Sequence, residues 1–389
     1  MPFAQRIAHL KAEGAYAVLA KATRLEAAGK DIIHLEIGQP DYETFSNVSL
    51  AGIKAIAQGQ TRYTAPDGMP SLKAVIARDA GTRRGIEVDP AEVVVSPGGK
   101  PNLFFPTLAL VEPNDEVIYP DPGFPTYEAM IRVPGGVPVA VPLLEGNQFS
   151  FDLAAFDKLI SPRTRMIILN SPSNPTGGVI PRADLEHIAA QAKKFDAWVM
   201  SDELYTRIVY DNLQVPSIAS LPGMKARTII VDGFSKTYSM TGWRLGYGIM
   251  PRDLADRVSL LLTHSLGSTA QFTQAAGIEA LTGPQDRVNA MVTEYQLRRN
   301  VVVDGLNSLP GFSCRKPQGA FYAFPNITGT GLDCETLASL ILEKAGVALL
   351  PGSSFGRYGA GYLRLSYANS IPNIEKALER IRGVLHAGA

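Results

Sequence analysis

Short apolar runs rich in β-branched residues recur through the middle of this chain of 389 residues, and helix-like segments separate them. The runs are hydrophobic almost throughout, which is typical of strands covered on both faces, as in a parallel sheet. Segments such as Ala183–Phe195 can supply the crossovers. The runs are Val93–Ser96, Glu116–Tyr119, Met166–Asn170, Trp198–Ser201 and Thr228–Val231. They predict a doubly wound, mostly parallel α/β domain over residues 46–284.

Different patterns flank this expected domain. After residue 284 come helical patterns at about 285–308, 333–345 and 372–387, with strand-like runs near 347–350 and 362–367. This order predicts a smaller α+β domain over 285–389. Before residue 46, a helix at 15–28 is followed by Gly29, which is favoured at a left-handed C-cap, and then by a strand at 32–38. We expect residues 1–45 to pack with the small domain.

Composition and charge argue against several classes of protein. Lys plus Arg and Asp plus Glu number 37 each, so the zero net charge gives no reason to expect nucleic acid or a membrane as a partner. No run approaches the length of a membrane span, and the start has no apolar signal core. Cys314 and Cys334 make no disulfide framework, and the five histidines lack metal-ligand spacing. We expect a cytoplasmic protein without a bound metal.

Polar or glycine-rich segments follow nearly every predicted strand of the sheet. In open α/β sheets, ligands bind beyond the carboxyl ends of the strands, so these segments are expected to form one composite site. They are Pro97–Lys100, Pro120–Tyr127, Ser171–Gly177, Asp202–Tyr205 and Asp232–Lys236.

One group of these residues suits an anion. Gly98 and Gly99 precede a helix, and the backbone N–H groups and dipole at such a position favour negative charge. Ser235 and Arg244 could donate to the same anion. A Walker phosphate loop is excluded, because Lys100 is followed by proline rather than Ser or Thr.

A second group suits a flat, cationic ring that carries an aldehyde. Asp202 could pair with a ring nitrogen, and Phe124 could stack on the ring. Lys236 could form an imine if neighbouring positive charge and burial lower its pKa. Each residue alone has a simpler explanation as a turn, cap, surface or core residue. Together they describe pyridoxal phosphate.

Eight segments in a fixed order make the chain resemble the class I/II aminotransferases, pyridoxal-phosphate enzymes of fold type I, over nearly its full length. It is most similar to the bacterial aspartate-aminotransferase-like branch. The segments are Gly38–Tyr42, Tyr63–Gly68, Pro97–Lys100, Asn174–Gly177, Ser201–Tyr205, Ser235–Tyr247, Gly319–Tyr322 and Tyr362–Tyr367. The lysine segment with its Thr-Gly-Trp-Arg ending is the most specific of them.

The resemblance implies a ping-pong transfer of an amino group between an L-amino acid and a 2-oxo acid. Lys236 would hold the cofactor as a Schiff base and move the substrate proton. Asp202 would keep the pyridine nitrogen protonated, and Tyr205 would bind the phenolate oxygen. Asn174 would contact that oxygen and the substrate, while Phe124 would stack on the ring.

The resemblance also implies how phosphate and substrate are held. Gly99, Lys100, Ser235 and Arg244 would surround the phosphate. Tyr63 would reach it from a partner subunit, which implies a homodimer with shared sites. The substrate α-carboxylate would be gripped by Arg364, in a pocket lined by Gly38.

The resemblance leaves the substrate open. Lys100 could pair with a distal carboxylate, which suggests glutamate, 2-oxoglutarate or aspartate as one substrate. The N-terminal segment departs from that branch, however, because Glu13, Gly14, Ala15 and Tyr16 stand where short hydroxyl residues help to hold that carboxylate. Glu13 would repel a second carboxylate, and Tyr16 could pack on a bulky side chain. We therefore expect the second substrate to be aromatic, aliphatic or a tailored amino acid.

Other functions compete with this interpretation. Another reaction of the same fold, such as β-elimination by a C–S lyase or decarboxylation, would use the same core residues. A serine hydrolase is suggested by Gly352-Ser353-Ser354-Phe355-Gly356, which matches the G-x-S-x-G pattern around Ser354. That pattern should lead into a helix, whereas a loop is expected after Gly356. A cofactor-binding regulator is disfavoured because no DNA-binding module precedes residue 30.

Overall fold

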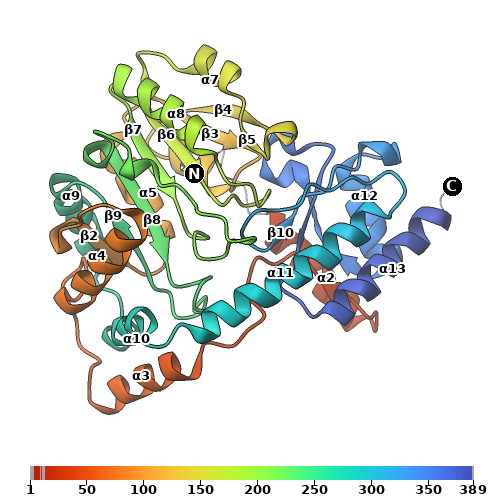
Figure 1. The fold of residues 1–389 in the computed structure, drawn as a ribbon, viewed down its shortest axis with the longest axis horizontal. Coiled ribbons are helices and arrows are strands. Elements are labelled where there is room, and N and C mark those ends of the chain that lie inside the picture. Colours follow the sequence, from red (N-terminus) through yellow and green to blue (C-terminus); the bar gives the residue numbers. More distant parts are fainter. Residues whose placement is uncertain (1–3, 9, 11–13, 388–389) are drawn as a thin grey trace.

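An eight-stranded sheet forms the largest layer of the computed structural model, which describes residues 4–8, 10 and 14–387 (Figure 1). The order is β2-β9-β8-β7-β6-β3-β4-β5, and the strands from β8 to β4 are parallel. Their bounds are β2 Val93–Ser96, β3 Glu116–Asp121, β4 Val137–Leu144, β5 Ser150–Phe151, β6 Thr164–Asn170, β7 Trp198–Asp202, β8 Thr228–Gly233 and β9 Gly246–Ile249. The predicted mostly parallel α/β fold is confirmed.

Helices cover both faces of this sheet because successive strand residues point to opposite sides. Val93 and Val95 pack with α3, α4 and α10, whereas Val94 packs with α5, α6 and α9. Nearer β4, the α7 and α8 helices complete the covering. The helices are α3 Ser46–Ala57, α4 Pro70–Arg84, α5 Lys100–Leu110, α6 Thr126–Arg132, α7 Leu153–Leu159, α8 Arg182–Lys194, α9 Arg252–Thr263 and α10 Gln271–Thr282.

Two small sheets lie on the other side of the molecule, beside the long helix α11 (Figure 1). A separate apolar core joins them to α11, α12 and α13. One sheet has the order β10-β13-β12, and the other pairs β1 with β11, so the N-terminal segment adds a strand to the C-terminal part. Bounds are α1 Gln5–Ala8, α2 Gly14–Ala27, β1 Ile33–His34, β10 Tyr322–Ala323, α11 Asp286–Asn307, α12 Cys334–Leu340, β11 Val347–Ala348, β12 Leu350–Pro351, β13 Leu363–Ser366 and α13 Ile371–Ala387. Among the described helices, none has the length and apolar character needed to cross a bilayer.

The structure corrects two predicted strands and adds others. The strand expected at 32–38 is only Ile33–His34, because the backbone beyond Leu35 turns to other partners, including the guanidinium of Arg364. The run at 347–350 is divided between β11 and β12. The prediction missed β4, β5 and β9, and in β9 the cause is clear. Gly246 cannot carry a side chain, because a Cβ there would lie 2.4 Å from the Gly98 backbone.

Candidate active site

The parallel strands end at one edge of the sheet and bring Asn170, Asp202 and the Lys236 segment together. Asn170 pairs with Asp202 across β6 and β7, and Asp202 pairs with Val231 across β7 and β8. The chain then continues through Gly233 to Lys236. The amide of Asn170 also donates to the Asp202 carbonyl at 3.1 Å.

Asp202 is a buried carboxylate held by neutral donors. The Tyr127 hydroxyl donates to Oδ2 at 2.7 Å, and the Leu204 backbone N–H donates to Oδ1 at 3.3 Å. Burial raises the pKa of Asp202 to about 6, although the Tyr127 hydrogen bond opposes the rise. A cationic group at this carboxylate would offset the cost of ionising it. Tyr127 was missed in the sequence because nothing in its residue type or spacing distinguishes it from a core tyrosine.

Lys236 is partly buried and reaches the segment that follows β1. Its ammonium donates to the Gly38 carbonyl at 2.5 Å and lies 6.0 Å from the centre of the Phe321 ring. A side chain at Gly38 would collide with Tyr322, since its Cβ would lie 2.2 Å from the Tyr322 hydroxyl. Glycine is therefore required for this segment to pass so close to Tyr322.

Arg364 enters the same region from β13 and is 3% exposed. Its guanidinium lies 4.6 Å from the ring centre of Tyr322 and 5.0 Å from that of Phe355. It donates to the Asn174 side-chain oxygen at 3.3 Å and to the Glu36 carbonyl. A guanidinium in this flat, aromatic setting is suited to bidentate binding of a carboxylate.

Tyr205 also lies in this region, beside Tyr322. Its hydroxyl is 2.8 Å from the Tyr322 hydroxyl, and both side chains are buried. Burial raises the pKa of Tyr205 well above its ordinary value, so this phenol stays protonated as a hydrogen-bond donor. The sequence singled out no role for Tyr322, which here connects Lys236, Tyr205 and Arg364 through Gly38.

The expected anion site lies between the N-terminus of α5 and Arg244. Gly98 has φ +87°, and a Cβ there would lie 2.2 Å from Nη2 of Arg244. Gly99 caps α5, and Ser235 is buried just before the lysine. Exposed N–H groups at a helix start and an adjacent guanidinium are a suitable environment for a phosphate.

Lys100 and Phe124 lie next to each other rather than at separate parts of the site. The Lys100 ammonium is 5.3 Å from the Phe124 ring centre, and the edge of that ring meets Tyr127 at 5.8 Å between centroids. Phe124 is thereby connected to Asp202 through Tyr127.

Other predicted residues lie elsewhere. Tyr63 is 97% exposed and does not enter the site of its own chain. Glu13 lies outside the described residues, and Tyr16 is exposed. Ser354 lies in a short 3-10 segment, Gly352–Phe355, that is followed by another 3-10 segment instead of the helix that a nucleophile elbow requires.

Comparison with known proteins decides the family. The family model described as "Aminotransferase class I and II" matches residues 30–381. The chain belongs to this family. It is an aminotransferase, and the suggested lyase, decarboxylase and serine hydrolase activities are not favoured.

Curated relatives and solved structures agree with this assignment. The chain is 40% identical to an aspartate aminotransferase of Geobacillus stearothermophilus, over 100% of both chains. It is 37% identical to aromatic-amino-acid aminotransferase 2 of Thermococcus litoralis, over 91% of this chain and 92% of that protein. The solved aspartate aminotransferase of Rhizobium meliloti superposes with a TM-score of 0.95 at 35% identity, and the match covers 99% of each chain.

Proposed function

We propose that this aminotransferase binds pyridoxal phosphate at the carboxyl edge of its large sheet and attaches it to Lys236. One observation carries the proposal. Lys236 donates to the Gly38 carbonyl and Arg364 donates to the Glu36 carbonyl, so an amine and a guanidinium meet on the same short segment. An amino acid whose carboxylate is held by Arg364 would therefore present its amino group and Cα near Lys236.

The residues present fit this cofactor. The loop around Gly98 approaches Arg244 so closely that a Cβ would fill the space, which suits a phosphate held by backbone N–H groups and a guanidinium. Asp202 is a buried carboxylate whose charge a protonated pyridine nitrogen would neutralise. When bound, pyridoxal phosphate supplies an electrophilic aldehyde and a protonated ring that takes up the charge left on Cα.

The protein's own groups would perform the remaining tasks. Asp202 would hold a proton on the ring nitrogen, with Tyr127 fixing its orientation. The Lys236 amine would take and return the Cα proton at Nζ in a largely buried site, where positioning and exclusion of water lower the barrier by several kcal/mol. Arg364 would bind and orient the α-carboxylate, next to Asn174.

The substrates are an L-amino acid and a 2-oxo acid, with glutamate, 2-oxoglutarate or aspartate as one partner. Lys100 beside Phe124 supports this choice, because a cation at that position could bind a distal carboxylate. For the second substrate we keep the expectation of an aromatic, aliphatic or tailored amino acid. Turnover of aspartate equal to that of every bulkier donor would contradict this expectation.

We further propose a homodimer with shared sites, in the cytoplasm. Tyr63 and three apolar residues of α3, Leu50, Ile53 and Ile56, are exposed in the single chain. Ile53 and Ile56 line a cavity of about 940 Å³ that also reaches Arg244. A second subunit would cover this apolar surface and bring its own Tyr63 toward the phosphate. The cytoplasm is supported by the cysteine content, since both cysteines are buried and unpaired.

We also propose the division into residues 1–45, 46–284 and 285–389. The pairing of β1 with β11 supports it, because the N-terminal segment contributes its strand to the C-terminal part. Most of the apolar core around α11, α12 and α13 comes from residues 285–389, which supports it as well, although Tyr205, Ile208 and Tyr210 also join that core.

A panel of amino donors with 2-oxoglutarate tests the proposed function. We expect wild-type protein with pyridoxal phosphate to be yellow and to form a keto acid and glutamate in equal amounts. Lys236→Ala should lose nearly all transfer, whereas the control Lys158→Ala, at an exposed position on α7, should keep it. Ammonia with pyruvate, or carbon dioxide, in place of these products would refute the transfer reaction.

A further inference from the structure

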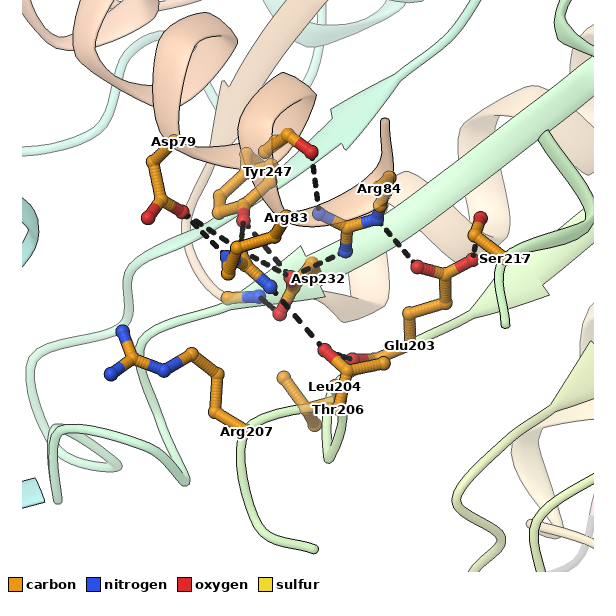
Figure 2. Close-up of polar contacts among 12 residues, drawn as sticks. Asp79, Arg83, Arg84, Glu203, Leu204, Thr206, Arg207, Ser217, Asp232 and Tyr247 are labelled. Carbon is orange, nitrogen blue, oxygen red and sulfur yellow. Dashed lines mark hydrogen bonds and ion pairs between the residues drawn. The ribbon is translucent and has the colours of Figure 1, made fainter. Parts of the chain in front are cut away.

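Figure 2 shows a buried ionic cluster that includes Glu203, the residue after the end of β7, and Asp232 of β8. At its centre is Arg84, the last residue of α4. Its Nε donates to Glu203 Oε2 at 2.5 Å, and its Nη2 donates to Asp232 Oδ2 at 2.8 Å. These three side chains are only 4–6% exposed.

The two carboxylates are close in sequence to Asp202 and Lys236. Glu203 directly follows Asp202 at the end of β7, and Asp232 lies on β8, four residues before Lys236. We infer that Arg84 is a positioning residue, which fixes the spacing between Asp202 and Lys236 by joining the ends of β7 and β8. The inference rests on the proposed function, since it assigns Arg84 a role toward those two residues.

Each carboxylate is also held from its other side. The Asp232 carboxylate accepts hydrogen bonds from the Tyr247 hydroxyl at 2.9 Å and from the Gly233 N–H at 2.7 Å. Arg83 adds a contact to Asp232 at 3.2 Å. The guanidinium of Arg84 therefore donates to a carboxylate of β8 that other hydrogen bonds already hold in place.

The carboxylate of Glu203 is held in the same way. Two hydroxyl groups donate to Glu203 Oε1, from Ser201 at 2.9 Å and from Ser217 at 2.7 Å. Arg84 thus connects two carboxylates that also accept hydrogen bonds from other groups, so a change in its geometry must move the strand ends or break a buried hydrogen bond.

Stability alone is a weak reason for such a cluster. Desolvation of a buried ion pair can cancel its attraction, and apolar side chains of similar volume are often as stabilising. The guanidinium of Arg84, in contrast, is planar and has fixed donor directions, so it sets the distance between the two carboxylates that it binds. A lysine ammonium has no such fixed directions. The location of the cluster at the site, rather than elsewhere along the sheet, favours a role in geometry.

The test compares Arg84→Lys with Arg299→Lys in the cofactor-loaded enzyme. Arg299 is the control because its guanidinium is also buried, at 1% exposed, and forks on a carboxylate, Asp211, at 2.8 and 3.0 Å. It lies on α11, away from the strand ends, and the side chain of Asp211 is 57% exposed. Three quantities are measured: the melting temperature, kcat, and the pH midpoint of the absorbance change of the bound cofactor without substrate.

We expect both variants to melt at lower temperature than wild type. Only Arg84→Lys should lower kcat, by at least about tenfold, because small misplacements of reacting groups are costly. It should also move the spectroscopic midpoint by about half a pH unit or more, since the charges around the cofactor shift. Glu203→Gln keeps the shape of the Glu203 side chain but removes its charge. It should change kcat and the spectroscopic midpoint in the same directions as Arg84→Lys, by smaller amounts.

Two results would overturn the inference. One is an Arg84→Lys enzyme that is destabilised like the control but keeps the wild-type kcat and midpoint. The other applies if Arg84→Lys does not fold: it is a Glu203→Gln enzyme whose kcat and spectroscopic pH midpoint equal those of wild type. Wild-type protein that stays colourless with pyridoxal phosphate would instead refute the proposed function.

Discussion

Replacement of Asp202 by asparagine should make the cofactor-free protein more stable while it abolishes most activity. Burial raises the pKa of Asp202 from 3.8 to about 6, so the folded protein pays to keep this carboxylate ionised at neutral pH. A rise of about two pKa units corresponds to about 3 kcal/mol. Asparagine has nearly the same shape, carries no charge, and can still exchange hydrogen bonds with Tyr127 and the Leu204 backbone.

The sign of this stability difference follows from proton binding by Asp202. Between pH 4 and 6 the folded protein holds the Asp202 proton more tightly than the unfolded chain does. The contribution of this carboxyl to stability is therefore present in full below pH 4 and is lost as the pH rises to about 6. Asp121, which burial also shifts to a pKa of about 6, is common to both proteins and cancels from their difference.

The assay is urea unfolding of both cofactor-free proteins from pH 4 to pH 8 at equal protomer concentration. We expect a stability gain for Asp202→Asn of up to about 3 kcal/mol at pH 7.5 that shrinks toward zero near pH 4. With cofactor, the variant should lose about 100-fold or more in kcat, because an electrostatic partner is missing. A variant that is less stable by the same amount at every pH would refute the reasoning.

Three further predictions concern neighbouring residues. Gly356→Ala should destabilise the protein by about 2 kcal/mol or more in urea unfolding. Gly356 has φ +125°, and an added Cβ would lie 2.1 Å from Asp121 Oδ1. Gly146→Ala, which adds a Cβ in open space, should have little effect. Arg364→Lys should raise KM for both substrates by about tenfold or more while the cofactor spectrum stays unchanged, since lysine cannot bind a carboxylate bidentately. Tyr127→Phe should weaken cofactor binding by about 1 kcal/mol in a fluorescence titration, because a hydrogen bond to Asp202 is lost; unchanged affinity would contradict that role.

The sequence predicted the sheet because its central strands are buried on both faces and read as continuous apolar runs. Val93–Ser96 and Trp198–Ser201 were placed within one residue of the observed strands. The strand Gly246–Ile249 was missed because two of its four residues are glycines, which have low strand propensity and are present for a close backbone approach.

Residue type and spacing singled out Lys236 and Asp202 from the sequence, and the structure brings the strand ends that precede them to one edge of the sheet. Tyr127, Tyr322 and Arg84 could not be found in this way, because their roles arise from contacts between segments far apart in the chain. Arg84 is bonded to residues 119 and 148 positions away. No local pattern in the sequence encodes such a contact.

Reduction of the cofactor-loaded protein with borohydride, followed by digestion and mass spectrometry, measures directly which amine holds the cofactor. We predict that the reduced cofactor mass is found on the peptide containing Lys236, and that Lys236→Ala protein carries no such adduct. A label on Lys100, or no label on a protein that transfers amino groups, would contradict the account.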